Sequence, residues 1–427
     1  MRIRNVILIN FVSQALNFGI PILLIPFLIG NLGVDIYGYF VYIQTVLQFP
    51  AIIVEFGYSL SAVRVISRRK NNLALRSQAF WAFWIIQWCL LFICASCLMF
   101  FLWLINVDDS SWLYYAIGYL VVVGQVMAPI WLFQGVELAH KVVIGQAAVK
   151  LILLPFFFFA IKNSIASYLV CALLYFAIAS LGGGVYILWM LFKLRLIKWN
   201  LPGYRYLLRI FRQSALIFYS KCFIFIYSNV PGILLAKVGG YTDLVIFNLA
   251  DKLRIVMQLV MNPLNSAVAP RVSYLFKTKN DEVLLLFKKL IVSMVFVNVS
   301  AWVLFYLLSP LYVSIFGAGA VDFERTLHVV RLMIAIPLVV MFSAIVGVNI
   351  MIPLGMHKEF LYSTAIAAAV SLCLSYPLQS GFGAKGATLQ ILLAELSVVF
   401  VCGIIFIQKY GVSACSKFIK KILTAKN

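Results

Sequence analysis

Long apolar stretches separated by short charged segments constrain this chain more than any other feature of its sequence. Hydrophobic residues make up 64% of its 427 residues, and charged residues only 11%. A soluble core needs far less apolar sequence, whereas one helix that spans a bilayer needs about 20 apolar residues. The pattern predicts an all-α polytopic membrane protein with about twelve spans. The predicted helices cover residues 6–30, 37–62, 78–105, 112–134, 143–161, 164–192, 214–236, 243–268, 289–308, 326–352, 360–378 and 385–408.

The positive charges predict how these helices are oriented. Lys and Arg near helix ends stay on the cytoplasmic side of a membrane. The first stretch is too long for a removable signal peptide and lacks a small-residue cleavage site, so we expect it to remain as a helix. With both termini in the cytoplasm, most of the 34 basic residues are cytoplasmic. The few that fall on the outer side are Lys162, Lys237, Arg325 and Lys385.

The net charge of +21 is therefore a signal of topology. No soluble domain carries it, so we expect no nucleic-acid partner. The chain has no G-x-x-x-x-G-K-[ST] loop, and its three His residues have no metal-ligand spacing. These absences predict no cofactor and no enzymatic activity. Energy for transport would come from a gradient of H⁺ or Na⁺, from the membrane potential, or from consumption of the product.

The longest polar interruption divides the predicted helices into two sets of six. It predicts an N-terminal lobe (1–192), a basic cytoplasmic linker (193–213), a C-terminal lobe (214–408) and a basic cytoplasmic tail (409–427). An even number of helices gives both lobes the same orientation, as in a parallel repeat. Faint self-similarity supports the division, because Leu32-Gly33 and Val238-Gly239 occupy nearly the same offset in the two halves.

Polar residues form stripes along the first two predicted helices of each half. In helix 243–268 they fall within an arc of about 120°, which Lys252 widens to about 160°. The stripe in that helix consists of Asn248, Asp251, Arg254, Gln258, Asn262 and Asn265. The other helices carry Asn10, Ser13, Gln14 and Asn17; Gln44, Gln48, Glu55 and Ser59; and Ser214, Lys221 and Ser228.

Five cationic and three anionic side chains lie inside predicted spans, where each would cost about 2.5–3.5 kcal/mol if it faced lipid. They are Glu55, Lys150, Lys221, Asp251, Lys252, Arg254, Arg331 and Glu395. The surplus of positive charge predicts a wet, cationic interior and an anionic cargo. Two pairings would reduce that surplus: Asp251 with Arg254 on one helix, and Glu395 with Arg331 between helices.

These patterns give two sets of candidate site residues. The predicted substrate-binding residues are Lys221, Arg254, Lys252, Lys150, Gln258, Asn262, Gln44, Gln48 and Asn17. The predicted coupling or gating residues are Glu55, Asp251, Arg64, Arg271, Arg331 and Glu395. Among them, Lys221 and Arg254 are the first choices for binding a diphosphate, which accepts point-charge and bidentate contacts.

Four short motifs resemble a known family. They are residues 55–57 (Glu-Phe-Gly) with Arg64 behind them, residues 131–137 (Trp-Leu-Phe-Gln-Gly-Val-Glu), residues 355–358 (Gly-Met-His-Lys) and residues 383–387 (Gly-Ala-Lys-Gly-Ala). The chain resembles the polysaccharide flippases of O-antigen assembly, in the multidrug/oligosaccharidyl-lipid/polysaccharide exporter superfamily. The resemblance runs over nearly the whole chain.

The resemblance implies two six-helix lobes around a central cavity that opens alternately to each side of the bacterial inner membrane. The implied substrate is an undecaprenyl-diphosphate-linked oligosaccharide, and the implied partners are membrane lipids and the polysaccharide polymerase machinery. Two alternatives stay open: a multidrug or small-molecule exporter of the same superfamily, and a polymerase or glycosyltransferase of the same pathway. A cationic interior disfavours cationic drugs, and the short outer segments offer an enzyme few acid or base groups.

Overall fold

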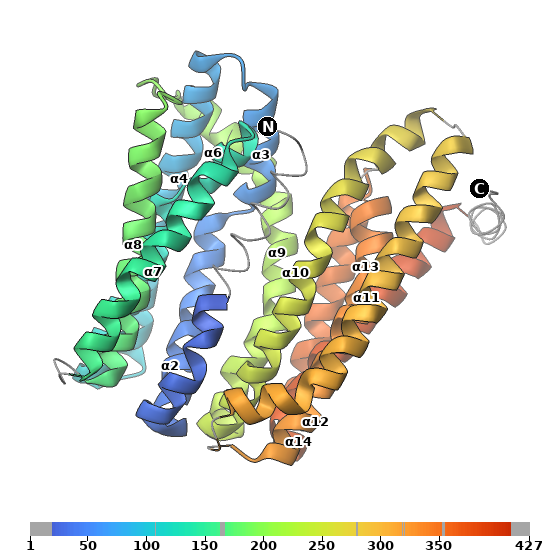
Figure 1. Cartoon of the computed structure of the whole chain (residues 1–427). Coiled ribbons are helices and arrows are strands. Elements are labelled where there is room, and N and C mark those ends of the chain that lie inside the picture. The colour runs from blue at the N-terminus through green and yellow to red at the C-terminus, as the bar shows by residue number, and fades with distance from the viewer. Residues whose placement is uncertain are drawn as a thin grey trace. The chain divides into compact units, whose positions relative to one another are not determined.

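Helices and short connections make up the part of the chain that its computed structural model describes, residues 19–106, 108–162, 167–278, 281–317, 319, 321–351 and 355–410 (Figure 1). Within these ranges side chains are described except at 109–110, 260–290, 348–349 and 410. The helices are α2 (Ile25–Glu55), α3 (Tyr58–Arg68), α4 (Leu73–Leu104), α5 (Asp109–Met127), α6 (Ile130–Gly135), α7 (Ala139–Lys162), α8 (Tyr168–Lys193), α9 (Tyr204–Val238), α10 (Gly240–Thr278), α11 (Asp281–Phe316), α12 (Phe323–Met333), α13 (Ile336–Ser343), the π-helix η1 (Ala344–Met351) and α14 (His357–Tyr410).

Nine helical segments within the described residues are long and apolar enough to cross a membrane. One of them, His357–Lys409, contains two of the predicted spans. At 1.5 Å per residue, its 53 residues are far longer than a bilayer is thick. The chain is therefore an all-helical, multi-pass membrane protein.

Residues with positive φ mark several helix boundaries. Gly33 in α2 has φ 76° and ψ 166°, between the predicted spans 6–30 and 37–62. Gly383 in α14 has φ 54° and ψ −129°, between the predicted spans 360–378 and 385–408. Only glycine adopts such angles without steric cost. Gly240, with φ 80°, begins α10, directly after the Val238-Gly239 pair that matches Leu32-Gly33.

Three predicted helices are interrupted, and for these the prediction of a single continuous helix is wrong. Span 37–62 breaks after Glu55, where Phe56 and Gly57 are left-handed. Span 112–134 breaks at Ala128 and Pro129, because proline cannot donate to the preceding turn. Span 326–352 is divided into α12, α13 and η1. Hydropathy measures the length of an apolar stretch and does not detect a local change of backbone conformation.

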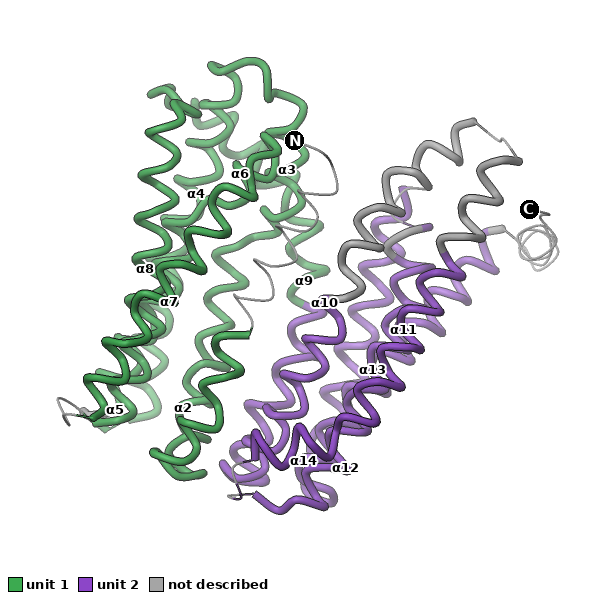
Figure 2. Tube along the Cα trace, viewed as in Figure 1, with its two compact units in different colours: residues 1–222 green, residues 223–427 purple. Residues whose placement is uncertain are grey.

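The chain forms two compact units, residues 1–222 (unit 1) and 223–427 (unit 2), coloured separately in Figure 2. The division falls within α9, which begins at Tyr204 inside the stretch predicted as a linker. The second half of residues 193–213 is therefore helical. The assignment of 1–192 and 214–408 as two lobes stays a prediction.

In unit 1, α8 packs closely against α5 at a run of glycines. A methyl group added to Gly184 would lie 2.8 Å from the carbonyl oxygen of Gly124, and one added to Gly124 would overlap Ser180. Small residues let membrane helices approach until their backbones touch. The run at residues 182–184 thus has a structural role in helix packing.

The motif at residues 131–137 forms the short helix α6 and its end, in the core of unit 1. Trp131 is buried, and its ring centre lies 5.7 Å from that of Phe80 and 5.5 Å from that of Phe83. Gly135 lies against Ile66 of α3, where an added methyl group would come within 2.6 Å. The motif therefore packs α6 onto α3 and α4.

In unit 2, the buried carboxylate of Asp243 connects α10, α12 and α14. Its oxygens lie 2.7 and 2.9 Å from a terminal nitrogen of Arg325, and one accepts from the backbone N–H of Ala384 at 3.2 Å. A methyl group on the adjacent Gly383 would overlap this carboxylate. The motif at 383–387 therefore fits a glycine bend around a buried acid.

Candidate functional site

The first candidate site in unit 1 lies at the break between α2 and α3. A methyl group on Gly57 would come within 3.0 Å of Ile217 on α9 and 3.2 Å of the backbone nitrogen of Phe218. Gly57 also has φ 72°, so the position requires glycine for both its space and its conformation. This close approach brings the start of α3 against α9 and places Glu55 beside it.

Glu55 is the centre of a hydrogen-bond network at this break. Its carboxylate accepts from the backbone N–H groups of Gly57 at 3.1 Å and Ser59 at 2.8 Å. Free N–H groups at the start of a helix attract an anion, and here the carboxylate satisfies two of them. Lys221 of α9 donates to both carboxylate oxygens, at 2.9 and 2.8 Å, and to the Ser59 hydroxyl at 2.7 Å.

The Glu55–Lys221 pair is half-buried, with 32% and 29% of the two side chains exposed. It joins residues 166 positions apart in sequence. Two predicted site residues, one assigned to coupling and one to substrate binding, are thus direct partners. Solvent reaches both groups, so an anion that arrives there could compete with Glu55 for the ammonium group.

A separate cavity of about 200 Å³ in unit 1 is neutral. Gln44 and Gln48 of α2 and Gln125 of α5 supply its polar groups, and the rest of the wall is apolar. The prediction placed Gln44 and Gln48 on one polar face, and they do share this cavity. Neither Glu55 nor Lys221 lines it.

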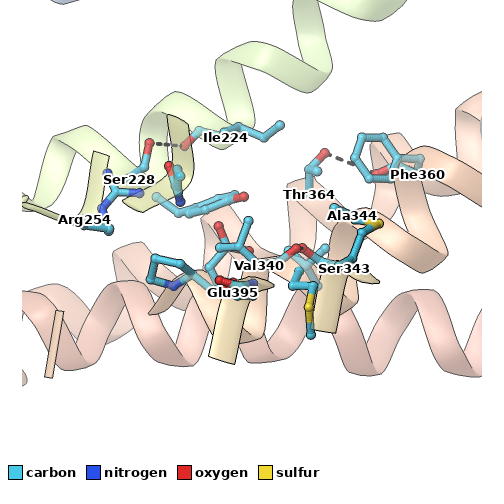
Figure 3. Close-up of a pocket in the computed structure, with 16 residues that line it drawn as sticks. Ile224, Ser228, Arg254, Val340, Ser343, Ala344, Phe360, Thr364 and Glu395 are labelled. Atoms are coloured by element: carbon cyan, nitrogen blue, oxygen red, sulfur yellow. Dashed lines mark hydrogen bonds between the residues drawn. The ribbon is translucent and has the colours of Figure 1, made fainter. Parts of the chain in front are cut away.

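Unit 2 contains a larger cavity, of about 370 Å³, whose lining residues all belong to that unit (Figure 3). We call it the unit 2 cavity. Helices α9, α10, α11, α13 and α14 and the π-helix η1 contribute to its wall. The lining residues are Ile224, Tyr227, Ser228, Arg254, Gln258, Met294, Asn298, Pro337, Val340, Met341, Ser343, Ala344, Phe360, Thr364, Glu395 and Val398. A π-turn often marks a functional position, and here it begins at the cavity wall.

The charged lining residues of the unit 2 cavity are Arg254 and Glu395, and Arg254 is paired with Asp251, which does not line the cavity. Asp251 Oδ1 lies 2.7 Å from Nε and 2.6 Å from a terminal nitrogen of Arg254, and the side chains are only 18% and 11% exposed. Glu395, with 7% of its surface exposed, lies near Tyr227, Ser343 and Arg254. The expected pairing of Asp251 with Arg254 is therefore present.

The expected pairing of Glu395 with Arg331 is wrong. Arg331 lies over the ring of Tyr306, with its guanidinium carbon 4.6 Å from the ring centre, and its Nε donates to Ser309 at 3.4 Å. Arg254 takes the place near Glu395. Sequence spacing could not make this choice, because both arginines lie on helices that precede α14 by many residues.

Two amide side chains at the unit 2 cavity have polar atoms without a hydrogen-bond partner in the described part of the chain. Asn298 is fully buried; its Nδ2 donates to the carbonyl of Pro337 at 3.1 Å, and its Oδ1 has no hydrogen-bond partner among the described residues. Gln258 is half-buried, and its amide has no hydrogen-bond partner among the described residues. A polar group buried without a partner is costly and is satisfied when a matching ligand binds.

The remaining predicted residues are dispersed. Arg64 is exposed on α3, and Lys150 and Lys252 are half-buried on α7 and α10 without lining either cavity. Asn17, and the side chains of Asn262 and Arg271, lie outside the described residues. The sequence analysis did not identify Asn298, although an amide side chain inside an apolar span is a usable signal of a polar site. It also did not identify Tyr227 and Thr364, for which the sequence contains no such signal.

The family is decided by a match to the sequence. Residues 3–276 match the family model described as "Polysaccharide biosynthesis protein". The chain belongs to the polysaccharide biosynthesis protein family. This confirms the resemblance drawn from the motifs.

Two bacterial proteins are similar to the chain over nearly its whole length. The chain is 25% identical over 423 residues to an Escherichia coli (strain K12) protein named "Putative O-antigen transporter", covering 96% of this chain and 98% of the relative. A Shigella dysenteriae protein of the same name is 25% identical over 396 residues, covering 92% and 97%.

Solved structures of two transporter types share the fold. An inward-facing multidrug resistance MATE family transporter of the MOP superfamily gives a TM-score of 0.71 at 12% identity, covering 97% of this chain and 96% of that one. The lipid II flippase MurJ gives 0.66 at 14% identity, covering 98% and 90%. These likenesses show that the chain has the fold shared by both transporter types.

Proposed function

We propose that this protein translocates a lipid-linked oligosaccharide, the repeat unit of O-antigen or a related surface polysaccharide, across the bacterial inner membrane. In this proposal twelve helices form two six-helix lobes around a central cavity that opens alternately to the cytoplasm and the periplasm. The lipid is undecaprenyl diphosphate, and both chain termini are cytoplasmic. The lipid tail stays in hydrocarbon while the diphosphate and the sugars pass through the protein.

The observation that carries the proposal is the similarity, over nearly the full length of both chains, to two proteins named as O-antigen transporters. The two polar cavities support it, because polar and charged groups inside a membrane span are expensive and usually serve transport. A protein that only anchored other components would have no need for them.

Lys221 is the proposed diphosphate contact. Its ammonium group is partly exposed and is held by Glu55 and Ser59, so a diphosphate can take the place of the carboxylate. Arg254 has the same proposed role with weaker support, because two of its nitrogens already contact Asp251. Glu55 or Asp251 is the proposed carrier of a coupling H⁺ or Na⁺, and the polysaccharide polymerase machinery is the proposed partner.

The test is rescue of surface polysaccharide in a strain that lacks the protein. We expect the wild-type chain to restore it and the double variant Lys221→Ala plus Arg254→Ala to fail at equal protein level. The two single variants rank the contacts, and Lys221→Ala is expected to have the larger effect. Full rescue by the double variant would remove both residues from the mechanism, and normal polysaccharide in the empty deletion strain would refute the function.

Export of cationic drugs is a second candidate, because of one observation. Arg254 and Glu395 line the unit 2 cavity, and Asp251 is paired with Arg254, so one positive and two negative charges lie in or next to the wall and do not repel a cation. Drug-sensitivity profiling separates the two functions: a drug exporter predicts increased sensitivity of the deletion strain with intact polysaccharide, and the proposed flippase predicts the reverse.

A further inference from the structure

The unit 2 cavity differs from a phosphate site in its charge. Two nitrogens of Arg254 are already on Asp251, and Glu395 adds a second carboxyl group. Even with Glu395 protonated, these three groups carry no net positive charge. Phosphate recognition calls for cationic groups with free N–H donors, so while Arg254 is held by Asp251 a diphosphate is a poorer occupant of this cavity than of the Lys221 site.

The cavity is instead rich in groups that accept hydrogen bonds. The Oδ1 atom of Asn298 has no partner among the described residues, the amide of Gln258 is likewise unpaired, and the carboxyl group of Glu395 provides further acceptor positions. Arg254 keeps N–H donors beyond the two that contact Asp251. A matching ligand therefore carries several O–H or N–H groups and is not an anion.

The rest of the wall suits a ring with apolar faces. Tyr227 and Phe360 contribute aromatic side chains, and Ile224, Val340 and Val398 contribute aliphatic ones. In Figure 3, Ser228 and Thr364 bond to carbonyl groups of their own helices, so both hydroxyls are occupied within the wall. The volume of about 370 Å³ lies within the usual range of roughly 300–1,000 Å³ for small-molecule sites and is far larger than a bound cation needs.

We propose that the unit 2 cavity binds a neutral sugar residue of the transported oligosaccharide through Asn298, Gln258 and Glu395, separately from the diphosphate. The inference rests on the proposed function and deepens it. Hydroxyl or acetamido groups donate to the Asn298 oxygen and to Glu395, and the sugar ring lies between the aromatic side chains. Glu395 disfavours an acidic sugar at this position, because two carboxylates would meet in a poorly hydrated space.

The test compares two probes on the purified, full-length protein. The first is undecaprenyl diphosphate, and the second is the undecaprenyl-diphosphate-linked repeat unit extracted from the parent strain. We expect Gln258→Leu and Asn298→Leu each to weaken binding of the second probe by about threefold to tenfold, the effect of one hydrogen bond. Binding of the first probe is expected to stay at the wild-type value.

Gln258→Leu guards against a folding artefact, because its half-buried amide has no hydrogen bond to lose in the described protein. The matched control is Gln87→Leu on α4, which removes a buried amide whose Oε1 is also unpaired but which lines neither cavity. It is expected to leave both probes unaffected.

The outcomes separate this inference from the function beneath it. If both cavity variants bind the repeat-unit lipid as the wild type does, or lose both probes equally, the sugar site is refuted while the flippase stands. If the wild-type protein binds neither probe, the proposed function fails, and the sugar site fails with it.

Discussion

The two units handle their buried charges in different ways. In unit 1 the Glu55–Lys221 pair lies at a helix break, outside a neutral cavity lined by glutamines. In unit 2 Arg254 and Glu395 belong to the cavity wall itself. The sequence gives both halves similar polar stripes, yet the structure uses them differently. A shared repeat pattern predicts where polar residues occur and leaves their pairing open.

The difference bears on a cargo with chemically distinct parts. A diphosphate needs a cation that can be released from its internal partner, and the half-exposed Lys221 meets that condition better than Arg254 does. A sugar needs matched hydrogen-bonding groups, which the unit 2 cavity offers. Substitutions in the two units test this difference, beginning with the largest expected effect.

The aromatic core of unit 1 should give the largest effect on stability. Trp131→Ala removes a buried ring packed against Phe80 and Phe83, and we expect it to cost about 3–5 kcal/mol of unfolding free energy. Trp131→Phe should cost much less, because the indole N–H has no partner among the described residues. Unfolding titrations in mixed detergent micelles measure both. Equal losses would mean that the indole N–H, and not the packing of the ring, matters.

The Asp243 junction of unit 2 should give the next largest effect. Gly383→Ala adds a methyl group where the carboxylate of Asp243 lies, at φ 54°. We expect a loss of more than about 2 kcal/mol in the same titration, since a non-glycine residue in a sparsely populated backbone conformation costs about 1–3 kcal/mol and the overlap adds to it.

Gly240→Ala is the matched control for this substitution. Gly240 has φ 80°, but an added methyl group would meet no atom within 4 Å, so only the cost of the backbone conformation remains. If the two substitutions destabilise the protein equally, the contact between Gly383 and Asp243 does not limit the sequence there.

Hydropathy predicts some features of this structure and misses others. Apolar length located the nine segments of the described residues that are long and apolar enough to cross a membrane, and the turn residues Gly33 and Gly383 lie between predicted spans where hydropathy falls. Hydropathy missed the break after Glu55, because Phe56 is itself apolar and only its left-handed backbone ends the helix. At this break Gly57 packs on Ile217, which is distant in the sequence, so local hydropathy does not record the contact.

In the candidate sites, contacts within one helix were predictable from the sequence, and contacts between helices were not. The pairing of Asp251 with Arg254 follows from spacing on a single helix and was predictable. The partners Glu55 and Lys221 were each identified as functional candidates, but nothing in one sequence joins positions 166 residues apart. The unit 2 cavity was unpredictable for the same reason, because Tyr227, Asn298 and Glu395 come from three different helices.

The release of Lys221 from Glu55 gives a third prediction. Glu55→Gln retains one oxygen, which can accept from the N–H group of either Gly57 or Ser59, and it removes the charge that competes for Lys221. We expect the affinity for undecaprenyl diphosphate to rise by up to about fivefold, the equivalent of about 1 kcal/mol for a partly exposed ion pair. Glu137→Gln, which removes one partner of an exposed pair, is the control. An unchanged or lower affinity in Glu55→Gln would assign Glu55 a purely structural role.

Exposed ion pairs should have the smallest effect, and an equal one in the two units. Lys70 and Glu137 in unit 1 are 45% and 76% exposed, and Lys409 and Glu359 in unit 2 are 46% and 30% exposed. Water screens both pairs, so Lys70→Ala and Lys409→Ala should each change the unfolding free energy by under about 0.5 kcal/mol. A larger loss in only one unit, insensitive to added salt, would show that the units differ at their surfaces as well. Equal, salt-sensitive losses would confine the difference between the units to the helix break and the cavity wall, where the charges are withdrawn from water.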